Sequence, residues 1–375
     1  MMAPGKIRSY IVWSTVACLL VLATSCRDVA RETTRSKVET KEKPPGHEVT
    51  SPQEADKTAK AAAPVKQAAT TEVKPEEKKP AVRLALRFRP QDLTTYRVIE
   101  EVDRSVAWEG PPEKPTGFQG GHTGSRAEMT FGQTIQSVDE NGNATAEIEI
   151  EALKYVYRVR DNAVLNFDSA AEQDKDSPLQ KLIGQSYVVQ MSAAGQVLKI
   201  VDANEARAAV TGNEAANKTA LALLSPEVIS QRHTIPALPP ADKNELSPGQ
   251  SWSSVKAFSF DMMGSKSYEK AYTLKEIKKT GDQQLAIVEM NGVPSTAMAQ
   301  ELDKGQVTNP FEKMFDTTET YTGQLELDLA AGKVKRCLEE LRVGWVIVDP
   351  QPKEDKQPAA LRMAATRLYS IEQID

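Results

Sequence analysis

Apolar and polar residues alternate with a period of two along much of this chain, and this pattern limits the fold more than any other feature. Ala146, Ile148 and Ile150 alternate with three glutamates, as in a strand that buries one face and exposes the other. The same alternation covers residues 82–88 and 95–106. It predicts long antiparallel strands, because strands with one apolar face can share a core on that side.

Turn residues divide the alternating stretches into successive strands. Residues 139–143 predict a hairpin turn, and a change of phase after Ile150 predicts a bulge or bend near Ala152. Residues 110–124 hold three prolines and five glycines, so we expect a loop there, and a second loop over the polar residues 161–177. Further strands are expected over residues 185–191, 196–201, 258–262, 268–277, 285–290 and 336–348 and around 363–371, and a short helix over 178–183.

Helix-forming residues concentrate in the middle of the chain. Residues 202–210 and 214–232 are rich in Ala, Leu and Glu, with apolar residues at helical spacing. Pro226 lies inside the second stretch, and proline removes a helical hydrogen bond, so we expect two short helices there rather than one long helix. Residues 202–246 therefore form a helical connection, which three prolines close.

The parts on either side of this connection follow a similar order. Residues 247–252 precede a strand as residues 89–93 do, and residues 323–334 follow the order of residues 184–197. An internal duplication is one hypothesis, and chance similarity between strand-turn-strand segments is the other.

The predicted fold is therefore mainly β with a minor α segment. Its domain spans residues 83–375, with long antiparallel strands in two similar halves, 83–201 and 247–375. These strands would form a strongly bent sheet, or an open barrel that short helices partly cover.

The N-terminal residues have the pattern of a secretory signal. Residues 1–25 combine a basic start with a short apolar run that ends in small residues, and Cys26 follows. They resemble bacterial lipoprotein signals, although Ala23 stands where Leu is usual. That resemblance implies a lipidated Cys26 that anchors the protein in the membrane of the cell envelope, and Arg27 in place of Asp favours the outer membrane. The alternative is an ordinary signal peptide with a cysteine nearby.

A tether is expected to follow the anchor over residues 26–82. From Arg27 to Val82 the chain holds no aromatic residue and no Leu, Ile or Met, so it cannot bury enough apolar surface to offset the entropy of ordering. A flexible coil of about 56 residues spans roughly 40 Å. We therefore expect a disordered tether between the anchor and the domain.

Charge argues against nucleic acid as a partner. The whole chain has 47 Lys and Arg against 52 Asp and Glu. Removal of the signal, which carries Lys6 and Arg8, leaves 45 against 52, a formal net charge of −7. A protein that binds the phosphate backbone needs a basic face, so no nucleic-acid partner is expected.

The cysteines leave no disulfide to form within the chain. Cys18 is removed with the signal and Cys26 carries the lipid, so Cys337 remains alone. We interpret Cys337 as a small buried hydrophobic residue, with a reactive thiol as the alternative.

Five short stretches form a series found in a known family. The series of residues 166–169, 176–179, 184–187, 192–197 and 247–252 resembles the domain of unknown function 6263 family of secreted and lipidated bacterial proteins. The resemblance covers roughly residues 84–374. It implies an envelope protein of unassigned activity and transfers no catalytic residues.

The residues predict no metal or cofactor site. His47, His122 and His233 have no ligand spacing between them, and nucleophile elbows and phosphate-binding loops are missing from the sequence. One alternative is an envelope hydrolase that uses carboxylates such as Asp168 or Asp176, which would require a raised pKa in a cleft.

An apolar run in the second half contains the candidate ligand-facing residues. Phe258, Phe260 and Met262 alternate along a predicted strand and would line an apolar cavity, or else pack in the core. The sequence therefore favours a non-catalytic, envelope-anchored lipoprotein that binds an apolar ligand, such as a lipid, or a partner protein. A purely structural tethered module is a further alternative to the carboxylate hydrolase.

Overall fold

The computed structural model of the chain describes residues 81–110, 119–212, 214–260, 263–281, 283–295, 314–348 and 358–374. The predicted signal, Cys26, Met262 and all but the last two residues of the predicted tether lie outside the described residues. The described residues belong to one compact unit.

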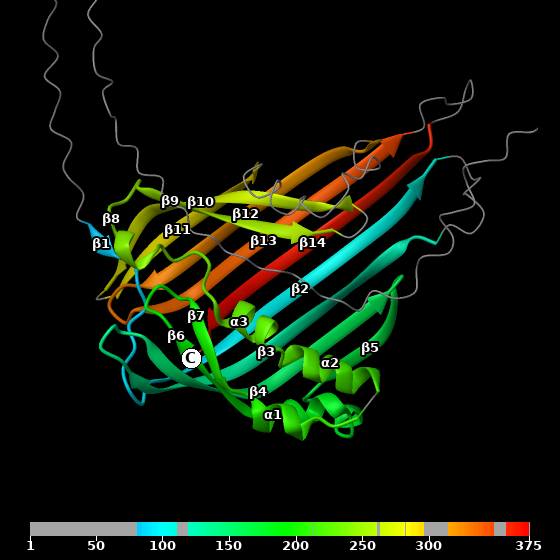
Figure 1. Cartoon of the computed structure of the whole chain (residues 1–375). Coiled ribbons are helices and arrows are strands. Elements are labelled where there is room, and N and C mark those ends of the chain that lie inside the picture. Colours follow the sequence, from blue (N-terminus) through cyan, green and yellow to red (C-terminus); the bar gives the residue numbers. More distant parts are fainter. Residues whose placement is uncertain are drawn as a thin grey trace, which may run out of the picture. The chain divides into compact units, whose positions relative to one another are not determined.

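Twelve antiparallel strands form one large sheet, which confirms the mainly β fold (Figure 1). Eleven follow a single path, β7-β6-β4-β3-β2-β14-β13-β12-β11-β10-β9, and the twelfth, β5, pairs with β4. The strands are β2 (Leu93–Glu109), β3 (Gly121–Val138), β4 (Ala144–Val159), β5 (Asn162–Asp168), β6 (Ser186–Met191), β7 (Val197–Asp202), β9 (Ser251–Ser259), β10 (Ser265–Thr280), β11 (Gln283–Ser295), β12 (Asp316–Asp328), β13 (Lys333–Val348) and β14 (Ala360–Gln373).

The strand order places the two halves of the chain side by side. Strands β2, β3, β4, β6 and β7 are consecutive neighbours, as are β9 to β14. The last strand, β14, pairs with the first long strand, β2, over residues from Gln373↔Tyr96 to Ala360↔Glu109. The sheet is open, with β7 and β9 at its two ends, so the bent-sheet alternative holds and the strands do not close.

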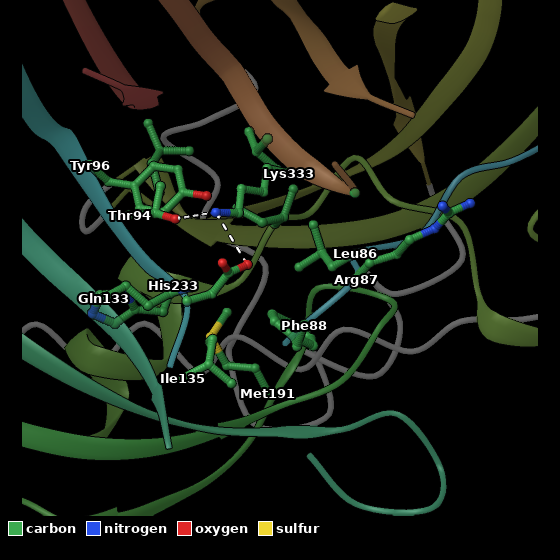
Figure 2. Close-up of a pocket in the computed structure, with 15 residues that line it drawn as sticks. Leu86, Arg87, Phe88, Thr94, Tyr96, Gln133, Ile135, Met191, His233 and Lys333 are labelled. Carbon is green, nitrogen blue, oxygen red and sulfur yellow. Dashed lines mark hydrogen bonds and ion pairs between the residues drawn. The ribbon is translucent and has the colours of Figure 1, made fainter. Parts of the chain in front are cut away.

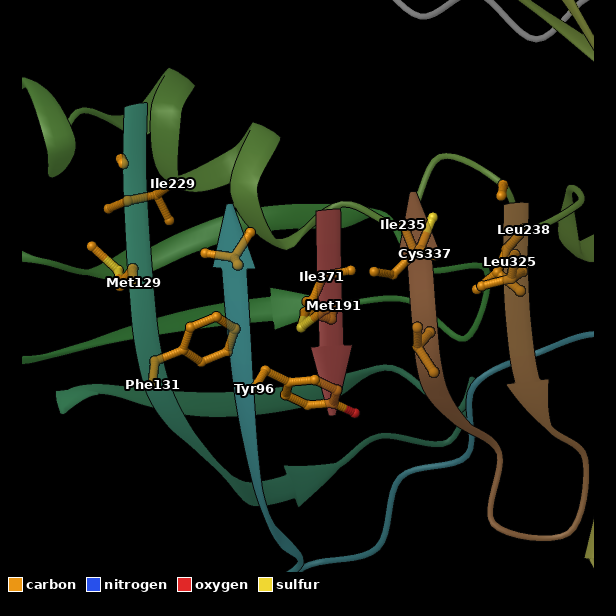
Figure 3. Close-up of a cluster of buried hydrophobic side chains, with 14 of the residues drawn as sticks. Tyr96, Met129, Phe131, Met191, Ile229, Ile235, Leu238, Leu325, Cys337 and Ile371 are labelled. Atoms are coloured by element: carbon orange, nitrogen blue, oxygen red, sulfur yellow. The ribbon is translucent and has the colours of Figure 1, made fainter. Parts of the chain in front are cut away.

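One face of the sheet, called the inner face below, carries the core. A row of buried residues in matched register crosses five neighbouring strands; its members are Met129, Val98, Ile371, Cys337 and Leu325. Figure 3 shows side chains of helix α3 and of residues 235–238 meeting this row. The row exists because period-two alternation places every second side chain of each strand on the same face.

The opposite, outer face carries charged side chains. Arg126 Nη1 donates to Glu101 Oε2 over 2.6 Å, and Arg97 Nε donates to Glu372 Oε1 over 3.0 Å. Both pairs join neighbouring strands and remain partly exposed. This face therefore matches the solvated side that the alternation predicts.

Three short helices connect the halves: α1 (Asn204–Ala209), α2 (Ala215–Leu223) and α3 (Pro226–His233). Pro226 lies in the first turn of α3, and the Ser225 hydroxyl accepts a hydrogen bond from the amide of Val228. This confirms two short helices over residues 214–232, because proline suits a helix start and not its interior. Arg232 Nε then ties α3 to β2 by donating to Glu100 Oε2 over 2.9 Å.

The prediction of a strand over residues 82–88 is wrong beyond Arg83. Strand β1 (Val82–Arg83) pairs only with β8 (Glu245–Leu246). The next amides donate to three different segments: Leu84 to Asn244 O at 2.8 Å, Leu86 to Ala193 O at 2.8 Å and Arg87 to Gly332 O at 2.9 Å. Residues 84–88 therefore form a buried strap across the inner face. Leu84 and Leu86 pack in the core, while the backbone of the strap forms no continuous pairing with a neighbouring strand.

Two predicted loops contain strand residues. Strand β3 begins at Gly121, inside the loop expected over residues 110–124, because residues 121–124 pair with β2. Strand β5 lies inside the loop expected over residues 161–177 and pairs with the end of β4. Its Phe167 is 1% exposed. The strand forms a local hairpin with β4 through Arg160 and Asp161, both of which have a positive φ.

The strand predicted over residues 258–262 is wrong beyond Ser259, where β9 ends and the amide of Phe260 donates to Gly264 O over 2.8 Å. Other local predictions hold. The register shifts between Thr130 and Phe131, opposite Ala152 and Ile150, which is the expected bulge. Residues Pro178–Leu182 form a short 3-10 helix. In the part of the chain that the structure describes, no helix combines the length and apolar character needed to cross a membrane.

Candidate functional site

A cavity of about 280 Å³ lies at the end of the inner face where the second half begins. Strands β9 and β10, the turn between β6 and β7, and the proline-rich segment 236–240 form its walls. The lining residues are Ala194, Gln196, Pro236, Leu238, Pro239, Pro240, Trp252, Ser253, Ser254 and Tyr272. This space is called the Trp252 cavity below.

Two aromatic side chains form one wall of the Trp252 cavity. Trp252 on β9 and Tyr272 on β10 are partners in the antiparallel register, so both point to the inner face. Their rings stack with centroids 5.6 Å apart and an interplanar angle of 15°. The opposite wall holds Leu238, 5% exposed, and three prolines, which supply apolar surface and no backbone N–H. The cavity is therefore mostly apolar.

Two polar atoms are buried in this wall. The indole N–H of Trp252 and the hydroxyl of Ser254 have no hydrogen-bond partner among the described residues. An unsatisfied buried polar group costs about 1–3 kcal/mol. Both atoms have almost no accessible surface, so they lie behind the cavity wall and do not face the cavity.

A buried charged cluster lies beyond the stacked rings. Glu339 Oε1 and Oε2 accept hydrogen bonds from the hydroxyls of Tyr272 at 2.8 Å and Tyr321 at 2.9 Å, and Lys270 Nζ lies 3.6 Å from Glu339. Burial alone would raise the pKa of Glu339, but Lys270, Lys256 and the two hydroxyls together lower it. Glu339 is therefore held as a carboxylate.

A second, much smaller cavity lies in the first half, and it is called the Lys333 cavity below. Its volume is about 30 Å³, close to that of a single water. Figure 2 shows Lys333 reaching across it: the ammonium donates to Thr94 Oγ1 over 2.8 Å and lies 3.3 Å from Asp92 Oδ2. The chain fills this space with its own cation.

The same turn precedes the first strand of each half. In residues 89–92 and 247–250 the amide of the fourth residue donates to the carbonyl of the first, over 3.1 and 3.0 Å. The second residue is proline in both turns. The third residue, Gln91 or Gly249, has a φ of 67° or 98°. Both turns are therefore of type II, which needs a positive φ at the third position.

The strand after each turn joins its neighbour by the same hydrogen bonds. In the first half the amide of Gln91 donates to Ile135 O over 2.7 Å, and the amide of Ile135 donates to Asp92 O over 2.9 Å. In the second half the amide of Gly249 donates to Leu274 O over 2.7 Å, and the amide of Leu274 donates to Gln250 O over 3.0 Å. The two hairpins are thus structurally equivalent, while the duplication itself stays a prediction.

Each cavity combines the first hairpin of one half with a turn of the other half. The Lys333 cavity joins β2 and β3 to the turn between β12 and β13, and the Trp252 cavity joins β9 and β10 to the turn between β6 and β7. Thr94 and Trp252 each lie two residues after the end of a type II turn, so they occupy corresponding positions. Counted from the glycines Gly195 and Gly332, Gln196 corresponds to Lys333. The two cavities are therefore equivalent positions with different side chains.

Of the predicted ligand-facing residues, Phe258 lies on the same strand as Trp252 and Phe260 follows the end of that strand; neither lines a cavity. Phe258 and Phe260 are 7% and 5% exposed and pack against Tyr321 and Trp345, with ring centroids 5.7 and 5.3 Å apart. Arg367 lies over both phenylalanine rings. They form an aromatic cluster on the inner face, and a role in ligand contact stays a prediction for them and for Met262.

The two histidines that the structure describes are not brought together, and His47 lies outside the described residues. His122 Nδ1 lies 2.9 Å from Asp103 Oδ2 near the surface, whereas His233 is buried with its Nε2 atom 2.6 Å from the Tyr187 hydroxyl. In the described residues no group of three or more His, Cys, Asp or Glu side chains could hold a metal ion. Cys337 is fully buried, which agrees with its interpretation as a core residue.

The candidate carboxylate Asp168 has the environment of an ion pair. The Ala170 amide and then Lys154, whose Nζ is 3.2 Å away, lower the pKa of Asp168. Acid catalysis near neutral pH needs the opposite shift. The sequence analysis did not predict the Trp252 cavity. Trp252 and Tyr272 are neighbours only in the register of the β9–β10 hairpin, and the sequence alone does not supply that register.

Comparison with known proteins gives a family match and distant structural likenesses. The profile of the family of unknown function DUF6263 matches residues 141–334, and all five stretches that suggested this family lie in that range. No curated protein sequence matches the chain. A solved structure described as "lipid-protein interactions in lipovitellin" has a TM-score of 0.37 and 13% identity, and the match covers 77% of this chain and 26% of that one. The chain thus spans about a quarter of that chain's length.

Proposed function

The chain belongs to the DUF6263 family, whose function is unknown, and we propose that it binds a small apolar ligand in the Trp252 cavity without catalysing a reaction. The observation that carries this proposal is the cavity itself. A space of about 280 Å³ is close to the lower size of known ligand pockets, which are mostly apolar with a few polar atoms.

The comparison of the two equivalent positions supports a binding role. A side chain of the protein fills the Lys333 cavity, whereas Gln196 leaves the Trp252 cavity wide. Close packing is the rule in protein interiors, because a void forfeits dispersion contacts with its lining atoms. A ligand that contacts the Trp252 and Tyr272 rings would recover those contacts.

The rest of the proposal concerns location. Cys26, lipidated after removal of residues 1–25, would anchor the protein in the bacterial cell envelope, with the outer membrane favoured by Arg27. Support comes from the sequence pattern of the signal. Replacement of Cys26 by Ala should move the protein from the membrane fraction to the soluble envelope fraction, and unchanged membrane retention would contradict the anchor.

Binding can be tested with the fluorescent apolar probe N-phenyl-1-naphthylamine and the full chain. Ala194→Phe adds bulk to the Trp252 cavity and should weaken probe binding at least tenfold. Ala331→Phe is the matched control, because Ala331 occupies the equivalent turn and does not line the Trp252 cavity. Equal binding by the two variants, with unchanged melting temperatures, would reject the cavity as the binding site.

A further inference from the structure

Strand β9 lies at one end of the sheet, and its edge away from β10, called the free edge below, has no neighbouring strand among the described residues. Two hydrogen bonds show which residues face this edge. The amide of Leu274 donates to Gln250 O over 3.0 Å, and the amide of Phe260 donates to Gly264 O over 2.8 Å. Both pairs continue the register of β9 with β10. Because hydrogen-bonded pairs alternate with non-hydrogen-bonded pairs, the even-numbered residues of β9 bond to β10 and the odd-numbered residues face the free edge.

The odd-numbered residues of β9 therefore direct their main-chain N–H and C=O groups to the free edge; they are Ser251, Ser253, Val255, Ala257 and Ser259. Arg367 Nη2 donates to Ser259 O over 3.1 Å. The main-chain groups of the other four have no partner on another described segment. Such groups need a hydrogen-bond partner, which is water or another strand.

The side chains of β9 leave the free edge open to pairing. Natural sheets protect their end strands with charges, prolines, bulges or short length. Strand β9 holds no proline, its register with β10 runs without a shift, and its five odd-numbered side chains are uncharged. At the other end of the sheet, β7 is shorter, carries Lys199 and Asp202, and shifts its register with β6 twice. The protection is therefore missing at β9 alone.

The other half shows what the fold places at such an edge. Strand β2 corresponds to β9, because each follows a type II turn. The edge of β2 away from β3 is paired with the antiparallel strand β14, which follows β13 in the chain. In the first half, helix α1 follows β7 instead, so the described part of the chain supplies no strand for β9. The free edge is therefore equivalent to an edge that accepts an antiparallel strand.

The Trp252 cavity lies beside the free edge. It contacts the consecutive residues Trp252, Ser253 and Ser254, whose side chains point alternately to opposite faces of the sheet. A space that touches all three lies next to the strand, and this one also extends over the inner face to Tyr272. Residues 236–240 bound it on the other side. Because that wall belongs to the same chain, a single extended segment can enter the space, whereas the sheet of a second copy cannot.

We propose that the free edge of β9 binds an extended peptide segment of a partner protein as an additional antiparallel strand, with one apolar side chain of the segment in the Trp252 cavity. Main-chain hydrogen bonds to the odd-numbered residues would supply affinity, and the cavity would select the side chain. This inference rests on the proposed function, because it assigns the apolar group in the cavity to a peptide.

The test uses the heptapeptide acetyl-Thr-Val-Thr-Leu-Thr-Val-Thr-amide, which is titrated against the full chain to displace N-phenyl-1-naphthylamine. With Val and Leu on the inner face, the Thr residues lie opposite the odd-numbered residues of β9 and direct their N–H groups to them. N-methylation of the two inner Thr amides should weaken binding at least tenfold. N-methylation of the two Val amides, which face away from β9, is the matched control and should weaken binding less than threefold.

Two variants test the same contact from the side of the protein. Ser253→Pro removes an N–H from the free edge without removing a bond to β10, a position where an end strand accepts proline, and should weaken peptide binding at least tenfold. Ser253→Ala, which also loses the hydroxyl but keeps the N–H, is the matched control and should bind as the parent does.

Three results would overturn the peptide proposal while leaving apolar binding intact. They are a parent that binds the probe but not the peptide, equal binding of the two methylated peptides, and a dimer of the parent that Ser253→Pro converts to monomers, which would assign the edge to a second copy. Failure of the parent to bind the probe itself would overturn the proposed function as well.

Discussion

The ammonium of Lys333 donates a hydrogen bond to Thr94 Oγ1 over 2.8 Å and so links the turn between β12 and β13 to the start of β2. Asp92 lies 3.3 Å from the same ammonium. This contact joins the last third of the chain to the beginning of the domain, at the position where the other half has a cavity.

Lys333→Ala should therefore destabilise the domain. The variant loses a charge-assisted hydrogen bond and a partly buried ion pair, which together amount to about 1–2 kcal/mol. Urea unfolding measures the loss. Lys275→Ala is the control, since Lys275 pairs with Glu289 on a half-exposed surface and should change stability by less than about 0.5 kcal/mol. Equal effects would show that the Lys333 contact contributes no more than a surface pair.

Glu339→Gln should be among the most damaging single substitutions. Lys270 is fully buried, and the variant removes the carboxylate that balances its charge. Removal of one partner of a buried ion pair costs about 3–5 kcal/mol. Thermal and urea unfolding of the variant measure this loss.

The neighbouring residue gives a control with the same chemistry. Glu340 lies on the outer face and pairs with Arg342, which is largely exposed. Glu340→Gln should therefore cost less than about 1 kcal/mol. A similar loss in the two variants would contradict the assignment of a buried ionic cluster to the inner face.

His233 should make the protein less stable at low pH. Burial, with the charge of Arg232, lowers the pKa of His233 from 6.5 to about 3. Its contribution is complete above pH 6.5 and is lost as the pH falls toward 3, because the unfolded chain then binds a proton that the folded chain excludes. From pH 7 to pH 5 the free energy of unfolding should fall by about 2 kcal/mol through this group. Urea unfolding at both pH values should show a smaller fall in His233→Gln.

His122 should act in the opposite direction. The hydrogen bond to Asp103 raises the pKa of His122 despite some burial. Its contribution is therefore present below pH 6.5 and is lost as the pH rises through the raised pKa. His122→Asn should therefore make the fall in stability from pH 7 to pH 5 larger, because the variant loses this offsetting contribution. A smaller fall in this variant would contradict the assignment of that loss to His233.

The two type II turns should respond differently to alanine. Gly249 has a φ of 98° and no atom within 4 Å of an added Cβ, so Gly249→Ala has only a conformational cost, about 1–2 kcal/mol. Gln91 already carries a side chain at a φ of 67°, so Gln91→Ala should be nearly neutral. Urea midpoints compare the two, and equal losses would contradict the equivalence of the turns.

Much of the local structure could be predicted from the residues alone. Alternation marked most long strands and their buried faces, Pro226 marked the start of a helix, and the phase change near Ala152 marked a bulge. These features depend on neighbours a few residues away, so the local sequence contains the information. The strap over residues 84–88 could not be assigned correctly, because its hydrogen-bond partners lie on distant segments. Strand β5 was missed for another reason, because the polar residues that follow it led the whole stretch 161–177 to be interpreted as a loop, although β5 forms a local hairpin with β4.

The candidate site shows the same division. The sequence alone determined a β-rich domain with an apolar inner face, and it predicted that Phe258 and Phe260 lie on the same side of the chain. Only the tertiary structure decided that Trp252 meets Ala194 and Leu238 around a cavity while Phe258 and Phe260 pack against other aromatic rings. The physical reason is that alternation specifies the face to which a side chain points, whereas register and long-range packing decide what lies opposite.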